Sequence, residues 1–170
     1  MTDLSIRPAT RDDMDDVARL CWAYRDLLVE RSQGLPPVVD TYYARDSYAA
    51  LIADLPRIHA RPKGDILIAT LAGQTVGCAM YYPLTAPGTT EIKRVFVDPA
   101  GRGTGAGRAL MQDAMARARA DGYTRVVLDT ISPLTEAIAL YERLGFTPCA
   151  PFYDPDPAFA PYLRFFDHRL

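Results

Sequence analysis

Four glycines stand within seven residues, "GRGTGAG" at 101–107, directly before an alanine-rich apolar stretch. Glycine loses more backbone freedom on folding than any other residue, so such a cluster is costly unless something must approach the backbone closely. The first amides of a helix have no internal partner, and the helix dipole is positive at that end. The loop therefore predicts an anion site, to which Arg102 and Arg108 would add positive charge.

Three phosphate-binding patterns compete for this loop. The dinucleotide fingerprint G-x-G-x-x-G fails, because the sixth residue counted from Gly101 is Ala106. Counted from Gly103, it is Arg108. The P-loop fails because no Gly-Lys-Ser or Gly-Lys-Thr follows. The pattern Arg-x-x-Gly-x-Gly does fit, at residues 102–107. A plain loop-to-helix turn is the alternative, but it needs fewer glycines.

This third pattern resembles motif A of the GCN5-related N-acetyltransferase (GNAT) superfamily, the cradle for the pyrophosphate of acetyl-CoA. "EIKRVFVDPAGRGTGAGRALM" resembles that family's fourth strand and third helix. "EAIALYERLGF" resembles its motif B, and "IRPAT" with the acidic helix after it resembles its N-terminal start. The resemblance covers most of the chain, whereas residues 30–63 and 147–162 carry little of it.

The resemblance implies that acetyl-CoA is the cosubstrate and that backbone groups bind most of it. The strand holding Val95, Phe96 and Val97 would pair with the pantetheine arm. The pyrophosphate would lie on the amides of the glycine loop. The residues implied there are Arg102, Gly103, Thr104, Gly105, Ala106, Gly107 and Arg108. One departure is Leu134, which stands where the family often carries an asparagine or glutamine, seven residues before the motif B tyrosine.

Acetyl transfer to an amine requires a neutral nucleophile. A lysine-like amine has a pKa of about 10.4, so deprotonation at pH 7 costs about 4.6 kcal/mol, enough to favour a base. By resemblance, Glu91 matches the glutamate that serves as base in some histone-type members. The alternatives are a chain of water molecules, or a structural strand-end glutamate paired with Lys93 or a neighbouring arginine.

The leaving thiolate needs a proton donor, and Tyr141 is the candidate. It stands four residues before Gly-Phe, as in motif B. A phenol with a pKa of about 10 donates to a thiolate of pKa about 8.5 only if the two are held together. The alternative is an aromatic core residue at helical spacing with Ile138 and Leu144.

The acceptor side is predicted from the segments that vary within the family. The stretch "PFYDPDPAFAPY" and residues 42–48 combine aromatic and acidic side chains, which suit a small organic cation. These segments contribute Tyr42, Tyr43, Tyr48, Phe152, Tyr153, Asp154, Asp156 and Phe159, and the third expected strand adds Tyr81 and Tyr82. We therefore expect a small-molecule amine acceptor. The alternatives are a protein lysine or N-terminus, a non-catalytic acyl-CoA-binding module, and half-buried packing of these tyrosines.

These residues must be positioned by a mixed α/β fold. Alternating apolar residues and helical spacing predict about seven strands and four helices in one domain, residues 1–170. The resemblance implies the GNAT fold, in which these elements form a central mixed, mostly antiparallel sheet flanked by the helices. Strands are expected at 4–7, 65–71, 75–84, 90–97, 125–130, 146–152 and 161–170, and helices at 14–28, 41–55, 104–120 and 133–144. Thr10 and Asp13 form a capping box before the first helix, and Pro56 is expected to end the second.

Composition narrows the function classes further. The net charge is −2, 24% of residues are charged and 49% are hydrophobic, which is typical of a globular protein and argues against a general nucleic-acid binder. No apolar run is long enough to span a membrane, and "MTDLSIRPAT" does not resemble a signal peptide, so we expect a cytoplasmic protein. Cys21, Cys78 and Cys149 fit neither a disulfide framework nor a metal spacing, and no metal is expected. A homodimer remains open.

Overall fold

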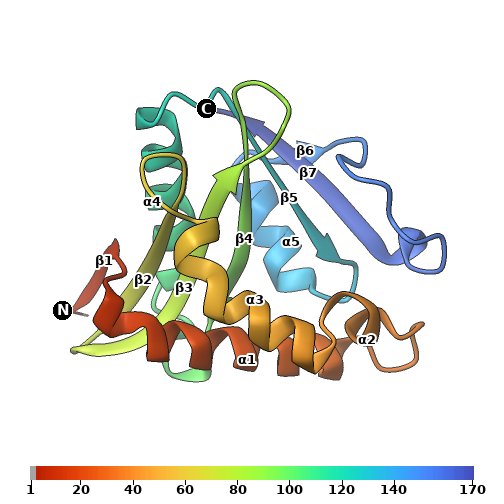
Figure 1. Cartoon of the computed structure of the whole chain (residues 1–170), viewed down its shortest axis with the longest axis horizontal. Helices are drawn as coiled ribbons and strands as arrows, with labels where there is room; N and C mark the ends of the chain where they lie inside the picture. The colour runs from red at the N-terminus through yellow and green to blue at the C-terminus, as the bar shows by residue number, and fades with distance from the viewer. Residues whose placement is uncertain (1–2) are drawn as a thin grey trace.

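A computed structural model describes residues 3–170, apart from the side chain of Val38. Seven strands and five α-helices follow one another along this part of the chain (Figure 1). They are β1 (Leu4–Pro8), α1 (Met14–Arg31), α2 (Val38–Tyr42), α3 (Arg45–Ile58), β2 (Asp65–Leu71), β3 (Gln74–Pro83), β4 (Thr89–Val97), α4 (Ala106–Ala120), β5 (Arg125–Ile131), α5 (Thr135–Arg143), β6 (Thr147–Pro148) and β7 (Leu163–Arg169).

One sheet contains all seven strands, in the order β1-β2-β3-β4-β5-β7-β6. Every neighbouring pair is antiparallel except β4 and β5, which run parallel. The predicted mixed, mostly antiparallel sheet is therefore confirmed. The parallel pair is also the place where the chain crosses over through α4, as parallel strands require.

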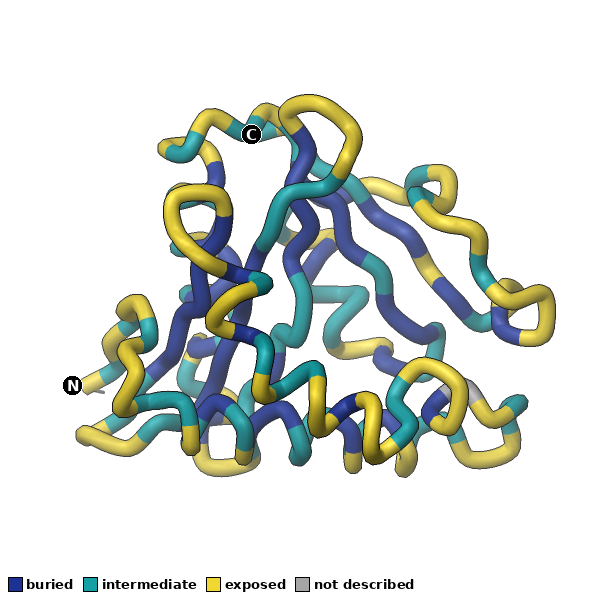
Figure 2. Tube along the Cα trace, in the orientation of Figure 1, coloured by how far each residue is buried: buried dark blue, intermediate teal, exposed yellow. Residues whose placement is uncertain are grey.

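Helices cover both faces of the sheet. α4 packs on one face, where Leu110, Met111 and Ala114 join a core with Leu67 and Tyr81. α1 and α3 lie in front of the opposite face in Figure 1, and their apolar side chains form a second core with β2, β3 and β4. The strands between these layers are buried, whereas the loops at both ends of the sheet are exposed (Figure 2).

The element boundaries differ from the predicted ones by a few residues in several places, four of which involve proline, glycine or an additional helix. Pro56 does not end α3, which continues to Ile58 with the proline inside its last turn. The segment predicted as a loop and one helix contains two helices, α2 and α3. α4 begins at Ala106 instead of Thr104, because the glycines before it are left-handed. The strand predicted at 146–152 is reduced to β6, where prolines at 148 and 151 remove amide donors from the ladder.

The parallel pairing of β4 and β5 is short. Only three residue pairs are in register, from Thr89 with Arg125 to Glu91 with Val127. Beyond Glu91 the two strands part, although β4 continues to Val97 and stays paired with β3 on its other edge. The fold therefore leaves one edge of β4 open in the middle of the sheet.

The predicted capping box is present, at the short 3-10 turn Arg11–Asp13 that leads directly into α1. Asp13 accepts hydrogen bonds from the Thr10 amide at 2.7 Å and from the Thr10 hydroxyl at 2.8 Å. It also accepts two from Arg7, at 2.7 and 2.8 Å. The Arg7 guanidinium and the Thr10 amide hold the pKa of the Asp13 carboxyl well below its usual range.

We expect Asp13→Ala to lower the free energy of unfolding by about 1 kcal/mol, as for the loss of a helix cap. Because the folded-state pKa is depressed, this stabilisation is complete above the unfolded carboxyl pKa of about 3.9 and is lost as the pH falls through the folded-state pKa. Urea unfolding of parent and variant at pH 7 and pH 3 checks this. The difference between parent and variant in the free energy of unfolding should be smaller at pH 3 than at pH 7. An equal difference at both pH values would contradict the role of the Asp13 carboxylate.

Candidate active site

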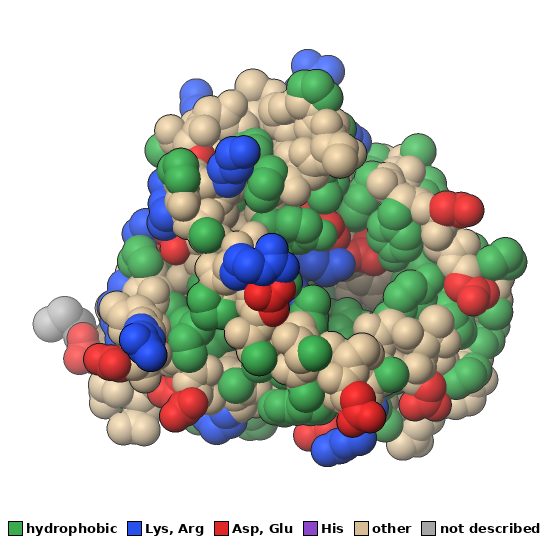
Figure 3. All heavy atoms as spheres, viewed as in Figure 1, with side chains coloured by type: hydrophobic (Ala, Val, Ile, Leu, Met, Phe, Trp, Pro, Cys, Tyr) green, Lys and Arg blue, Asp and Glu red, His purple; other side chains and the backbone are tan. Residues whose placement is uncertain are grey.

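Two cavities meet where β4 and β5 part. The first has a volume of about 340 Å³ and is lined by Asp129, among others; we call it the Asp129 cavity. The second has a volume of about 400 Å³ and is lined by Arg102; we call it the Arg102 cavity. Figure 3 shows a hollow on the α1 and α3 face, with basic and acidic side chains at its edge. Four residues line both cavities: Tyr24, Val95, Thr130 and Tyr141.

The glycine loop has the conformation that an anion cradle needs. Gly103 and Gly105 have φ angles of +76° and +86°, in the left-handed region that side chains rarely adopt. A Cβ built on either would have no other atom within 4 Å, so the space beside the loop is open. Ala109 donates to the Gly105 carbonyl at 3.0 Å. The amides of the three residues before it therefore lie ahead of the helical ladder, at the positive end of α4.

Gly101 has a different role from these two glycines. A Cβ there would lie 2.8 Å from Val97 and 2.9 Å from Val76, so only glycine fits between these side chains. The Thr104 hydroxyl donates to the Gly101 carbonyl at 2.6 Å and closes the turn. The loop is thereby held against the end of β4.

The predicted cofactor residues divide into two groups. Five of them line the Arg102 cavity: Val95, Phe96, Val97, Arg102 and Gly107. The others form the loop and the first turn of α4 beside it: Gly103, Thr104, Gly105, Ala106 and Arg108. The Arg108 side chain is exposed and does not line the cavity, so the contribution expected from this residue is that of its backbone amide. Leu134 is buried at the wall of the same cavity, where it offers an apolar contact.

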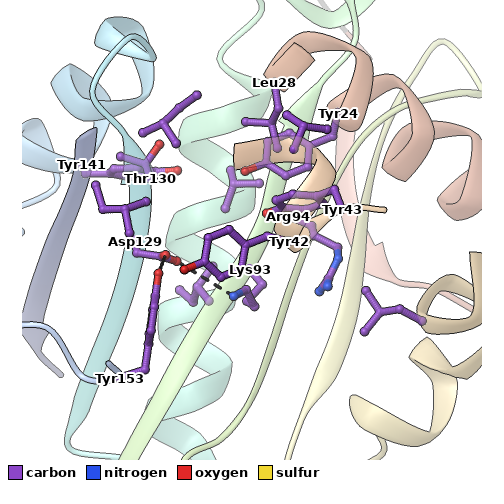
Figure 4. Close-up of a pocket in the computed structure, with 16 residues that line it drawn as sticks. Tyr24, Leu28, Tyr42, Tyr43, Lys93, Arg94, Asp129, Thr130, Tyr141 and Tyr153 are labelled. Atoms are coloured by element: carbon purple, nitrogen blue, oxygen red, sulfur yellow. Dashed lines mark hydrogen bonds and ion pairs between the residues drawn. The ribbon is translucent and has the colours of Figure 1, made fainter. Parts of the chain in front are cut away.

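Tyr141, on α5, lies at the junction of the two cavities (Figure 4). Its ring packs against Phe146 and Phe166, with centroids 6.0 and 6.2 Å away. Burial, together with the nearby Asp129 carboxylate, raises the pKa of the Tyr141 phenol. The hydroxyl therefore remains protonated at neutral pH and is available as a donor in both cavities.

Asp129 is the carboxylate of the first cavity, and the sequence reasoning did not select it. The Tyr153 hydroxyl donates to its Oδ2 atom at 2.6 Å, and the Lys93 ammonium lies 3.9 Å from its Oδ1 atom. Its side chain is 17% exposed. An acidic residue inside the apolar strand "RVVLDTI" was the available signal, because such a strand buries a charge only where it is paired or functional.

Glu91 lies beside this cavity but does not line it. It is 3% exposed on β4, where it accepts a hydrogen bond of 2.5 Å from the Tyr82 hydroxyl. The Lys93 ammonium lies 3.1 Å from its other oxygen. Burial and the Glu91 charge raise the pKa of Tyr82 to about 12. Burial disfavours the Lys93 charge, but Asp129 and Glu91 outweigh it and raise the pKa of Lys93. Lys93 thus links the two carboxylates.

Only part of the predicted acceptor wall reaches the cavity. Tyr42, Tyr43 and Tyr153 line it, whereas Tyr48, Tyr81, Tyr82, Phe152, Asp154, Asp156 and Phe159 do not. The Tyr48 hydroxyl is buried against the Cys21 carbonyl at 2.9 Å. Asp156 accepts the Ala158 amide at 2.8 Å within its own turn. The negative charge at this wall therefore comes from Asp129.

The described residues contain neither a membrane-spanning helix nor a cluster of metal-ligating side chains. Within residues 3–170, no helix is both long and apolar enough to cross a bilayer. The same residues hold no group of three or more histidine, cysteine, aspartate or glutamate side chains suited to a metal ion.

Comparison with known proteins places these features in a family. The model of the acetyltransferase (GNAT) family matches residues 23–146. An IAA acetyltransferase of Azospirillum brasilense is 38% identical over 119 residues, which are 68% of this chain and 78% of that protein. An N-acetyltransferase of Schizosaccharomyces pombe is 34% identical over 103 residues, which are 60% of this chain but only 63% of that protein. The chain thus spans less than two thirds of the latter.

Solved structures agree in fold. An acetyltransferase of the GNAT family from Staphylococcus aureus superposes with a TM-score of 0.74 and 16% identity, covering 98% of each chain. An acetyltransferase of Salmonella typhimurium, solved with its cofactor acetyl-CoA, superposes with a TM-score of 0.68 and 21% identity, covering 98% of this chain and 93% of that one. The glycine loop, the open edge of β4 and the family match over residues 23–146 lead to one conclusion: this chain belongs to the acetyltransferase (GNAT) family.

Proposed function

We propose that the protein transfers an acetyl group from acetyl-CoA to the primary amine of a small molecule. The observation that carries this proposal is the position of Tyr141, which lines both the cavity beside the phosphate loop and the cavity that holds a carboxylate. A reaction between two substrates needs such a shared point, because the amine must reach the thioester carbonyl beside the leaving sulfur. Acetyl-CoA supplies an activated thioester carbonyl.

The residues beside the Arg102 cavity fit acetyl-CoA. The loop offers amides at the start of α4 and empty space next to two left-handed glycines, which suits a pyrophosphate. The open edge of β4 offers backbone groups of Val95 and Val97 to an extended amide-containing arm. Arg102 adds a positive charge at the cavity wall.

In the reaction, a nitrogen–carbon bond forms and a carbon–sulfur bond breaks. An acceptor that arrives as an ammonium loses two protons, one before the attack and one after it. The second replaces the proton that Tyr141 gives to the thiolate, so one proton in all is released to solvent. Tyr141 donates the proton to the sulfur. Asp129 attracts the ammonium form of the acceptor and takes its proton, because it is the carboxylate that lines the cavity. Glu91 is the second candidate for the base, acting from behind Lys93.

A small acceptor fits the Asp129 cavity better than a protein segment does. Its volume of about 340 Å³ lies within the range of small-molecule sites. Tyr24, Tyr42 and Tyr43 form aromatic walls, which suit an organic cation. A protein lysine or N-terminus is the alternative acceptor.

Tyr141→Phe should lower kcat by about ten- to a thousandfold while the affinity for acetyl-CoA stays nearly unchanged, because the ring packing is kept and the donor is lost. Release of CoA thiol, measured with a panel of small amines and lysine-containing peptides, checks this and the acceptor class together. Parent-like turnover would make Tyr141 a packing residue. Better turnover of the peptides would favour the protein acceptor, and tight acetyl-CoA binding without any turnover would favour a non-catalytic module.

Gly105→Glu should abolish acetyl-CoA binding, because a carboxylate would repel the pyrophosphate. The matched control is Gly73→Glu, in the turn between β2 and β3, where φ is +80° and a Cβ also meets nothing within 4 Å. Both variants carry the same backbone strain and the same added charge, so their unfolding transitions should shift alike. Calorimetric titration with acetyl-CoA should show lost affinity only for the loop variant. Equal acetyl-CoA affinities of the two variants would show that the glycine loop does not bind acetyl-CoA.

Asp129→Asn should lower kcat/KM for a strongly basic amine at pH 7 by about a hundredfold. Raising the pH should recover part of this loss, because the amine then deprotonates in solution. Glu91→Gln is the matched comparison on the adjacent strand, and we expect a smaller loss with a parent-like pH profile. If Glu91→Gln instead shows the larger loss of kcat/KM and the greater recovery at high pH, Glu91 is the base.

A further inference from the structure

Arg94 enters the Asp129 cavity because β4 breaks its alternation there. Successive residues of a regular strand point to opposite faces. Ile92 and Val95, three residues apart, nevertheless both pack with the core on the α4 face. The register with β3 shifts at this point, and Arg94 has a φ of +54°. As a result, Lys93 and Arg94 both line the same cavity.

This backbone conformation is costly for a residue other than glycine. A left-handed φ costs about 1–2 kcal/mol, and such strain is found mainly where function requires it. The Cys78 thiol donates to the Arg94 carbonyl at 3.4 Å and holds the bulge from the neighbouring strand. The bulge places a second cation on the cavity wall, beside Lys93.

The Arg94 guanidinium has no counter-ion among the residues described. Lys93 is within ion-pair distance of both Glu91 and Asp129, whereas no carboxylate lies that close to Arg94. The buried Arg94 Nε atom lacks a hydrogen-bond partner, and an Nη atom contacts the Met80 sulfur at 4.0 Å. A guanidinium of this kind is a strong site for a carboxylate, which it can bind through two parallel hydrogen bonds.

Charged groups therefore follow one another across an otherwise largely apolar cavity. In Figure 4, Asp129 and Tyr153 lie on one side, Lys93 in the middle and Arg94 on the other side. The four charged groups Glu91, Lys93, Arg94 and Asp129 sum to zero. A ligand carrying both an ammonium and a carboxylate preserves this balance, whereas a bare amine adds an uncompensated positive charge to a partly buried site.

We propose that the acceptor is a free amino acid, whose carboxylate pairs with Arg94 while its amine faces Asp129 and Tyr141. The walls formed by Tyr24, Tyr42 and Tyr43, with Leu28 and Ile131, then contact an apolar or aromatic side chain. This inference rests on the proposed acetyltransferase function and specifies its substrate class.

The test compares leucine, methionine, phenylalanine and tryptophan with their amides, which keep the α-amine and lose the carboxylate charge. CoA thiol release is corrected for the deprotonated fraction of each amine. In the parent, kcat/KM should favour at least one free amino acid over its amide by about ten- to a hundredfold, the range for a charge-assisted hydrogen-bonded pair. Arg94→Gln should remove this preference, and Arg94→Lys should keep part of it. Arg119→Gln, on the exposed side of α4, removes the same charge elsewhere and should keep it in full.

Calorimetric titration of the same amino acids and amides in the presence of CoA separates the two levels of the proposal. Turnover of amines without preference for a carboxylate would overturn the Arg94 subsite and leave the acetyltransferase function standing. Carboxylate-dependent binding that is lost in Arg94→Gln, without turnover, would support the subsite and contradict the activity. Neither turnover nor carboxylate-dependent binding would overturn both. If Arg94→Gln does not fold, the preference of the parent for a free amino acid over its amide still tests whether the site binds a carboxylate.

Discussion

The parting of β4 and β5 is the constraint on which the rest of the structure depends. In a continuous sheet, the ladder between these strands would satisfy their backbone groups and close the middle of the molecule. Here the ladder ends after three residue pairs, at Glu91 and Val127. The open edge of β4 then borders both cavities, and α5 places Tyr141 where the two cavities meet. Two adjoining cavities thus follow from one interrupted strand pair.

Three of the four charged groups around this opening are joined by ion pairs, as burial requires. Asp129 is held by Tyr153 and faces Lys93, while Glu91 is held by Tyr82 and contacts the same lysine. Removing one member of such a network leaves another buried charge without a partner, which is more costly than the pair itself. Arg94 is the one of the four without a counter-ion among the residues that the structure describes. The positive charge is therefore unbalanced at the Arg94 end of the cavity.

Glycine contributes to the donor side by two separate physical effects. Gly101 is needed for space, because Val76 and Val97 occupy the place of a side chain. Gly103 and Gly105 are needed for conformation, because their φ angles are positive while the space around them is empty. Sequence alone does not distinguish these effects, since each residue contributes one more glycine to the same pattern. The distinction matters for the site, because only the open positions border the space available to a phosphate.

The sequence by itself determined the family resemblance, the mixed sheet, the glycine loop ahead of a helix at residues 102–107 and the placement of Tyr141 on a helix. Each of these is encoded in contiguous residues with a local pattern. Two element boundaries were predicted wrongly because Pro56 lies inside α3 instead of ending it, and because the left-handed Gly105 delays the start of α4 to Ala106. Only the tertiary structure decided which charges meet. Asp129 comes from β5, Lys93 from β4 and Tyr153 from the loop before β7, and strand register brings them together. The direction of Arg94 depends on a left-handed residue in a bulge, a conformation that the intrinsic preference of arginine disfavours and that only packing against β3 imposes.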